Sequence, residues 1–165
     1  MQKQFDEGFN QINENFKKLF RELFGGGRAE LQMDYTDCDD PLNAGVEIVA
    51  CPPGKKLTMI SLLSGGERAL TAIAILFAIL MLRPMPFCVL DEIEAALDEA
   101  NVDKFAQFLK KFAKETQFIV ITHRKPTMEK ADCLFGVTME EKGVSKIVSV
   151  KLPEVESKLG GDTVN

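Results

Sequence analysis

The sequence predicts an α/β fold in which helices flank a mostly parallel central sheet. Two short apolar runs, 87–90 and 117–121, have the composition of buried parallel strands, and an amphipathic helical pattern at 98–114 separates them. A long apolar helical pattern at 65–83 precedes the first run. An N-terminal helix and a closing β-hairpin complete the expected architecture.

The composition is that of one soluble globular domain. The chain has 165 residues, 45% of them hydrophobic, and a formal net charge of −5. A general nucleic-acid surface would be basic and clustered, so any DNA contact must be local or be made by another part of a larger protein.

Cysteine usage and hydropathy indicate a cytoplasmic protein. The four cysteines show no C-x-x-C pairing, which indicates reduced thiols rather than a disulfide framework or a zinc site. No signal-peptide pattern opens the chain, and the longest apolar stretch, 69–82, is shorter than the roughly 20 residues of a membrane span. We therefore expect no membrane segment.

The first 24 residues predict an amphipathic helix. Apolar side chains recur at spacings of four, three, four, three and four, as in a heptad seam. The spacing alone fits equally well a helix that lies on its own domain and the end of a coiled coil. The seam consists of Phe5, Phe9, Ile12, Phe16, Leu19 and Leu23, with Phe20 and Phe24 beside it.

The region after this helix is expected to be rich in β-structure. Gly25–Gly27 end the helix, and strands are expected at Arg28–Met33 and Val46–Cys51. The acidic loop 34–41 lacks the glycine and the closing glutamate of an EF-hand, so we interpret it as a solvated turn. The turn 52–56 then reverses the chain to form a hairpin.

That turn contains Gly54 and Lys55 but is not a phosphate-binding P-loop. A P-loop needs G-x-x-x-x-G-K-[ST], and here Val49 stands at the first glycine position and Lys56 at the hydroxyl position. No other stretch fits the pattern, so the chain contains no Walker A motif.

Ser64 and Glu67 have the spacing of a capping box, which predicts that a helix begins at Ser64. Because Gly65 and Gly66 lack a β-carbon, another surface can approach the first amides of this helix at the positive end of its dipole. Such a helix start can bind an anion, and phosphate is the commonest ligand. Two glycines at a helix start can also be purely structural.

The apolar run 87–90 ends in two adjacent carboxylates, Asp91 and Glu92. Ligands of open α/β sheets bind at the carboxyl ends of the strands. An acidic pair at that place suits a metal ion and a water molecule, with Asp91 toward the Mg²⁺ of a nucleotide and Glu92 toward the attacking water. His123 stands two residues past the end of the next predicted strand, 117–121.

The remaining sequence predicts a helical turn at 128–131 and then two strands, 133–138 and 144–152, in a closing hairpin. From residue 153 the chain is polar and lacks a core pattern, so we expect a mobile tail.

The motifs named above resemble those of ABC ATPases. Leu63-Ser-Gly-Gly-Glu67 resembles the signature motif, and Phe87–Glu92 resembles a Walker B strand with its catalytic glutamate. Ala96-Leu97-Asp98 resembles a D-loop, and His123 stands where the switch histidine belongs. The run Asp91–Val102 is close to that of the bacterial structural maintenance of chromosomes (SMC) proteins.

The resemblance extends over roughly residues 5–152 and implies the C-terminal half of an SMC ATPase head, the C-terminal lobe of an ABC-type ATPase. Residues 1–24 would be the end of a coiled-coil helix, 25–152 the lobe itself, and 153–165 the mobile tail. The phenylalanines of the first helix would then face an absent coiled-coil partner helix.

The site residues implied by the resemblance fall into two groups. The catalytic group would comprise Glu92, His123 and Asp98, with Asp91 on Mg²⁺ and His123 sensing the terminal phosphate of ATP. The signature group would bind, in trans, the ATP held by a second head, and comprises Leu63, Ser64, Gly65, Gly66 and Glu67.

The resemblance also implies partners and a cellular role. The partners would be the N-terminal lobe of the same SMC protein, which supplies Walker A, a second SMC head, the C-terminal winged-helix domain of a kleisin, and DNA through the full complex. The role would be ATP-dependent chromosome condensation and segregation in the cytoplasm, on the nucleoid. The chain alone would be inactive, because it lacks Walker A.

Two other functions are compatible with parts of the sequence. One is a coiled-coil repair ATPase of the same superfamily, which the run Glu94–Val102 disfavours. The other is a non-catalytic scaffold that only binds kleisin, which the intact pair Asp91 and Glu92 disfavours, because a scaffold has no use for a water-activating glutamate.

Overall fold

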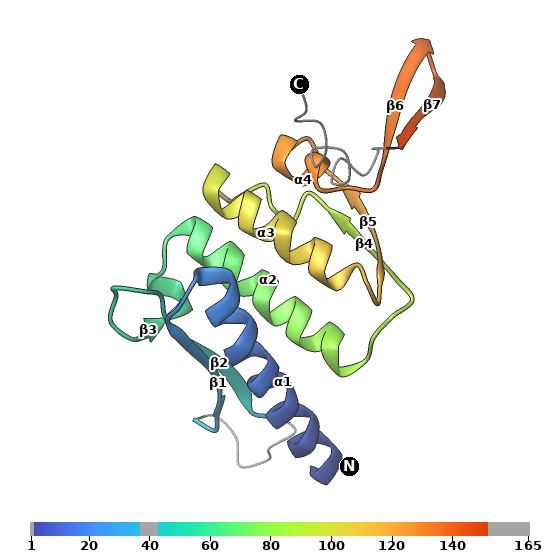
Figure 1. The fold of residues 1–165 in the computed structure, drawn as a ribbon. Helices are drawn as coiled ribbons and strands as arrows, with labels where there is room; N and C mark the ends of the chain where they lie inside the picture. Colours follow the sequence, from blue (N-terminus) through green and yellow to red (C-terminus); the bar gives the residue numbers. More distant parts are fainter. Residues whose placement is uncertain (1, 37–42, 152–165) are drawn as a thin grey trace, which may run out of the picture.

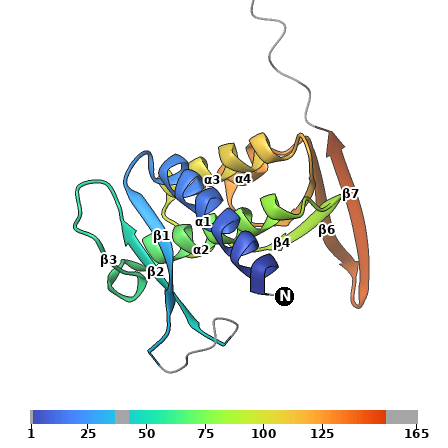
Figure 2. The same cartoon turned by 90° about the horizontal axis from the view of Figure 1, so that it is seen from below.

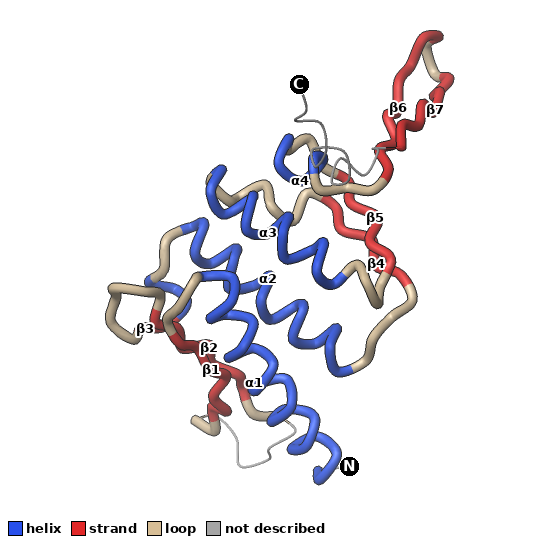
Figure 3. Tube along the Cα trace, viewed as in Figure 1, coloured by secondary structure: helices blue, strands red, loops and turns tan. Residues whose placement is uncertain are grey.

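The structure is a computed structural model that describes residues 2–36 and 43–151. Four α-helices and seven strands occur in these two ranges (Figure 1; Figure 3). The helices are α1 (Gln2–Phe24), α2 (Gly65–Leu82), α3 (Glu99–Phe112) and α4 (Lys125–Glu129). The strands are β1 (Arg28–Asp34), β2 (Gly45–Cys51), β3 (Thr58–Met59), β4 (Phe87–Asp91), β5 (Gln117–Ile121), β6 (Cys133–Glu141) and β7 (Val144–Lys151), and a 3₁₀ turn covers Ile60–Leu62.

Two sequence predictions fall partly outside the described residues. These are the acidic loop 34–41, of which residues 37–41 are not described, and the polar tail 153–165, of which none is described.

Helices α1, α2 and α3 lie side by side and enclose an aromatic core (Figure 1). The Phe77 ring of α2 makes edge contacts with Phe108 and Phe112 of α3, at centroid distances of 5.0 and 5.3 Å. Each fully buried phenylalanine contributes about 1.5–3 kcal/mol through burial of apolar surface. The phenylalanines with no exposed surface are Phe16, Phe20, Phe77 and Phe105.

The C-terminal half of α1 packs on its own domain. Phe16, Phe20 and Leu23 are buried in the core. The Asn13 side chain donates to the Leu31 carbonyl at 3.2 Å and accepts from the Leu31 N–H at 2.8 Å, which ties the helix to the edge strand β1. The expectation that the phenylalanines of this helix face an absent partner is therefore wrong for Phe16 and Phe20. The same apolar stripe that fits a heptad seam packs here on α2 and β1.

Glycines make the turn from α1 into β1 possible. Gly25 and Gly27 have φ values of 69° and 77°, in the left-handed region that favours glycine. The N–H of Gly26 donates to the Arg21 carbonyl at 2.8 Å and closes the helix end. A Cβ at Gly27 would overlap the carbonyl oxygen of Cys51, so β1 and β2 approach each other closely at this point.

The described strands form three separate sheets. β1, β2 and β3 are antiparallel in the order β1-β2-β3, with Arg28 opposite Cys51 and Asp34 opposite Gly45. β4 and β5 are parallel, and β6 and β7 form an antiparallel hairpin. The expectation of one mostly parallel sheet is thus not met among residues 2–36 and 43–151. Connections too short for a crossover helix join the other strand pairs, and such connections produce antiparallel pairing.

The two antiparallel sheets lie at opposite ends of the molecule, with the helices between them (Figure 2). The parallel pair β4–β5 presents one face to the helices, where Cys88, Leu90, Phe118 and Val120 pack on or within the core. The other face carries apolar side chains that are about half exposed, namely Phe87, Val89, Ile119 and Ile121.

Helix α2 is the most apolar of the described helices. Among the described residues it is the one helix whose length and composition would allow it to span a membrane. The core helix of a soluble protein meets the same criterion, and α2 packs here against α1 and α3 through buried residues such as Leu70, Ile73 and Phe77.

Candidate functional site

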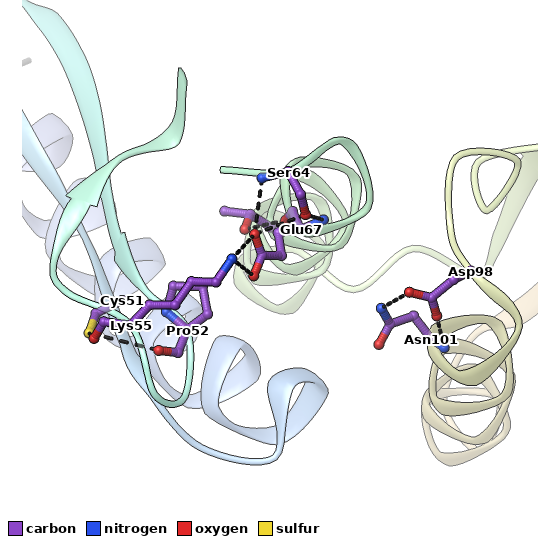
Figure 4. Close-up of polar contacts among 8 residues, drawn as sticks. Cys51, Pro52, Lys55, Ser64, Glu67, Asp98 and Asn101 are labelled. Carbon is purple, nitrogen blue, oxygen red and sulfur yellow. Dashed lines mark hydrogen bonds and ion pairs between the residues drawn. The ribbon is translucent and has the colours of Figure 1, made fainter. Parts of the chain in front are cut away.

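The start of α2 has the predicted capping box. The Ser64 Oγ accepts from the Glu67 N–H at 3.3 Å, and the Ser64 N–H donates to Glu67 Oε2 at 3.0 Å (Figure 4). Leu63 is 5% exposed and anchors the segment before the helix. The helix therefore begins where the sequence predicts, and the chain's own side chains organise its first turn.

Lys55, in the turn between β2 and β3, forms an ion pair with Glu67. Its Nζ lies 2.8 Å from Glu67 Oε1 and 2.9 Å from Oε2 (Figure 4). The hydrogen bond from Lys55, followed by that from the Ser64 amide, holds the pKa of the Glu67 carboxyl below its usual 4.5. No local pattern in the sequence predicts this pair, because the two residues belong to different elements.

The two glycines at this helix start have different surroundings. A Cβ at Gly65 would meet open space, whereas a Cβ at Gly66 would lie 3.6 Å from the Ala96 carbonyl oxygen. The first amides of a helix have no acceptor within it, and the helix dipole is positive at this end. An anion can therefore approach at Gly65, while Gly66 lies against the segment that follows β4.

The carboxyl ends of β4 and β5 bring Glu92 and His123 together. Asp91 ends β4 opposite Ile121, and the Glu92 N–H donates to the Ile121 carbonyl at 3.0 Å. Glu92 Oε1 lies 3.2 Å from Nδ1 of His123, and the two side chains are 54% and 66% exposed. Glu92 has a φ of 46°, which non-glycine residues rarely adopt and which occurs preferentially at functional sites.

Asp98 has a structural task in this chain. Its Oδ1 accepts from the Asn101 N–H at 2.9 Å, and its Oδ2 accepts from the Asn101 side-chain amide at 3.1 Å (Figure 4). Asp98 is therefore the N-cap of α3. Among the described residues, neither Asp98 nor Ser64 forms a hydrogen bond or ion pair with Glu92 or His123.

Sequence reasoning overlooked several residues that link the segments around this site. Glu94 is fully buried, and its Oε1 accepts hydrogen bonds from Thr122 and Thr127 at 2.5 and 3.2 Å. The Arg124 guanidinium donates to the Leu97 carbonyl at 3.1 Å. A glutamate in a loop gives no sequence signal of burial, so these contacts become visible only in three dimensions.

The donor set around Asp91 fits Mg²⁺ that is shared with a nucleotide. No group of three or more metal-binding side chains occurs among residues 2–36 and 43–151. Mg²⁺ at nucleotide sites is typically held by one or two carboxylates together with phosphate oxygens and water, and it rarely has a cage made of protein side chains alone. A single exposed carboxylate at the end of β4 is consistent with that mode of binding.

Comparison with protein families identifies the group to which the chain belongs. Residues 5–146 match the RecF/RecN/SMC N terminal domain family. The chain is 67% identical over 156 residues to the chromosome partition protein Smc of Bacillus subtilis, and 60% identical over 152 residues to that of Desulfitobacterium hafniense. These matches cover 94% and 92% of the chain but only 13% and 12% of the relatives.

Solved structures give the same result. A structure from work on ATP-driven dimerization and DNA-stimulated activation of SMC ATPases aligns with a TM-score of 0.82 and 44% identity, and covers 92% of this chain and 90% of that one. A Pyrococcus furiosus Smc head domain with an extended coiled coil, bound to the C-terminal domain of ScpA, aligns with a TM-score of 0.75 and 47% identity over 87% of this chain and 35% of that one. The chain therefore belongs to the RecF/RecN/SMC family and corresponds to part of an SMC ATPase head.

Proposed function

We propose that this chain is the C-terminal lobe of an SMC ATPase head, which completes a composite ATP-hydrolysing site with an N-terminal lobe that carries Walker A. The observation that carries the proposal is the contact of Glu92 with His123 at 3.2 Å, beside Asp91, at the carboxyl ends of two parallel strands. The chain holds groups that can activate water, and it has no P-loop to hold a triphosphate.

Each of the three side chains has a role in this proposal. Glu92 orients the attacking water and accepts its proton, and His123 donates a hydrogen bond to the terminal phosphate and helps to hold that water in line. Asp91 would hold Mg²⁺ together with the phosphate oxygens. When bound, Mg²⁺ neutralises the charge that develops on the phosphoryl group.

The start of α2 acts on a different nucleotide. In the proposed arrangement, Ser64, Gly65 and Gly66 meet the terminal phosphate of ATP held by an opposing head, so ATP joins two heads and hydrolysis releases them. The open space at Gly65 and the orientation of the first amides support this role. Among the described residues, no hydrogen bond or ion pair joins Ser64 to Glu92 or His123, which is compatible with one lobe contacting two nucleotides. Asp98 would act at the interface between the two heads. Both of its carboxyl oxygens accept hydrogen bonds from Asn101, so it would hold the start of α3 in place there.

The exposed apolar surfaces support two protein partners. The outer face of β4–β5, with Val89 54% and Ile119 48% exposed, suits the N-terminal lobe. A kleisin C-terminal winged-helix domain would bind exposed apolar side chains near β1–β3 or on the closing hairpin, such as Leu62 and Val137. The binding of a ScpA C-terminal domain by the Pyrococcus furiosus head is consistent with this.

The cellular role follows from the relatives. The two Smc relatives described above are chromosome partition proteins, so the whole protein would act in chromosome condensation and segregation, in the cytoplasm on the nucleoid. Contact with DNA would be made through the full complex, because the net charge of −5 gives this lobe no general nucleic-acid surface.

Reconstitution tests the proposal. Purified chain should neither bind ATP at micromolar concentration in calorimetry nor hydrolyse it, and turnover should appear when a lobe with Walker A is added. Micromolar ATP binding by this chain alone would overturn the half-site assignment.

Two variants in the reconstituted head separate the two groups of site residues. Ser64→Arg places a bulky side chain where the opposing nucleotide must dock, so each head should bind ATP without joining another head. Glu92→Gln keeps the carboxylate of Asp91 but removes the base, so ATP-joined dimers should form and persist. Both variants should lose turnover, and light scattering with ATP should distinguish them. Monomeric Glu92→Gln heads or normally dimerising Ser64→Arg heads would contradict the trans mechanism.

A further inference from the structure

Glu94 is a buried carboxyl group without a task in the mechanism above. It has no exposed surface, and its Oε1 accepts hydrogen bonds from the hydroxyls of Thr122 and Thr127. Its second oxygen, Oε2, is buried and has no hydrogen-bond partner among the described residues. A polar group in this situation needs an explanation.

Fold stability does not supply the explanation. Burying a carboxyl group costs free energy, and an incompletely paired one costs more. An apolar side chain of similar size is often as stable as a buried polar group, or more stable. The residues that Glu94 holds therefore matter more than the free energy that it contributes.

Those residues lie on both sides of His123. Thr122 immediately precedes it, and Thr127 belongs to α4, which immediately follows the loop. Thr122 Oγ1 also accepts from the Arg124 N–H at 3.0 Å, so the hydroxyl that donates to Glu94 shapes the backbone just after His123.

A second link joins the same two segments. The Arg124 guanidinium donates to the Leu97 carbonyl, one residue before Asp98. Two sets of hydrogen bonds therefore join the 92–98 segment to the 122–127 segment. Glu94 of the first segment accepts from the second, and Arg124 of the second segment donates to the first. Neither Glu92 nor His123 has comparable restraint of its own, since both side chains are more than half exposed.

We propose that Glu94 is a positioning residue: it fixes the loop that carries His123 against the segment that carries Glu92, and so sets the contact between these two side chains. Reacting groups are typically held by hydrogen bonds from residues that do not themselves touch the substrate. The consequence for ATP turnover rests on the proposed function. The consequence for the geometry of His123 does not.

The spectroscopic test uses the isolated chain, in which His123 is the only histidine. Its ring ¹H and ¹⁵N resonances at one fixed pH report the contact with Glu92. Glu92→Gln supplies the resonance positions expected when the carboxylate partner is lost. Glu94→Gln keeps an oxygen acceptor for both threonines and should retain the wild-type positions. Glu94→Met removes the acceptor and should move the resonances toward those of Glu92→Gln.

Two further variants keep the test decisive. Thr127→Val is nearly isosteric, removes one of the two donors and should move the resonances in the same direction even if Glu94→Met does not fold. Thr71→Val, which removes a buried hydroxyl in α2 that donates to the Glu67 carbonyl, should leave them in place. Wild-type ring resonances in folded Glu94→Met, or in Thr127→Val, would overturn the positioning role.

Turnover in the reconstituted head gives an independent readout. Glu94→Met should lower kcat on the order of 100-fold, the cost of a small displacement of a reacting group, without loss of ATP affinity, whereas Glu94→Gln should keep most of the activity. An inactive wild-type reconstituted head would contradict the proposed function alone, and the histidine resonances would still decide the role of Glu94. A kcat for Glu94→Met equal to that of the wild type would contradict the positioning role.

Discussion

The two faces of the β4–β5 pair differ in what covers them. On the inner face, Leu90 is 3% exposed, and Phe118 packs on the core with its ring 5.8 Å from that of Phe77. On the outer face, Phe87 and Ile121 are 56% and 52% exposed although they are equally apolar. Parallel sheets are normally covered on both faces. The difference indicates that these strands are adapted to a second layer that the described part of the chain does not provide.

The same contrast separates the two antiparallel sheets. β1 is covered by α1 and joined to it by the hydrogen bonds of Asn13. The β6–β7 hairpin projects from the body of the molecule, and Phe135, Val137 and Ile147 on one of its faces are 68%, 71% and 69% exposed (Figure 1). A two-stranded hairpin is marginally stable by itself. The face of the β1 sheet that packs on α1 is thus covered, whereas the β6–β7 hairpin and the outer face of β4–β5 are uncovered surfaces suited to partners.

Two substitutions compare the covered core with the uncovered outer face of β4–β5. Phe77→Ala removes the ring at the centre of the core and should lower the free energy of unfolding by about 3–5 kcal/mol. Val89→Ala on the outer face should change it by roughly 0.5 kcal/mol, because the side chain is already half exposed. Urea unfolding followed by circular dichroism measures both. Equal losses would mean that the outer face is covered in solution.

A charge on the outer face of β4–β5 should weaken the binding of a partner lobe. Val89→Asp should leave the unfolding midpoint of the isolated chain nearly unchanged but weaken its association with a Walker A lobe on the order of 100-fold, because about 3 kcal/mol is lost when an unpaired carboxylate is buried. Lys114→Asp, an exposed change beyond the end of α3, is the matched control and should leave the affinity unaltered. Binding measured by interferometry compares the two. Normal binding by Val89→Asp would place the partner lobe on another surface.

Local patterns predicted much of this structure. The strand Gln117–Ile121 has the predicted bounds, and α2 starts after Ser64 as the capping box requires. The proximity of Glu92 and His123 could be predicted from the sequence, because both follow the carboxyl ends of neighbouring parallel strands. These features depend on short-range spacing and on one general rule of α/β sheets.

Features that depend on which surface covers another could not be predicted from the sequence. An apolar stripe such as that of Phe16 packs equally well on a coiled-coil partner or on its own domain, and only the assembled chain decides between them. The helix α4 begins at Lys125 rather than at the expected 128, since Pro126 is tolerated in the first turn. The apolar runs at β4 and β5 indicated full burial, and each proved to be covered on a single face.

The start of α2 is exposed at Gly65, yet the chain's own side chains pair with the polar groups of its first turn. Glu67→Gln keeps the capping box but removes the charge that pairs with Lys55, so at pH 7 it should cost about 0.5 kcal/mol of unfolding free energy. The folded-state pKa of Glu67 is lowered, so its charge stabilises the fold above the usual 4.5, and this stabilisation is lost as the pH falls through the folded-state value.

The difference between wild type and Glu67→Gln in urea titrations should therefore be constant from pH 7 to about pH 5 and disappear in more acidic solution. Lys55→Met should show a similar loss at pH 7, because it removes the same pair from the other side. A difference that grows on acidification would mean that Lys55 does not hold Glu67 as the structure describes. In that case the capping box of Ser64 and Glu67 would organise the first turn of α2 without help from Lys55.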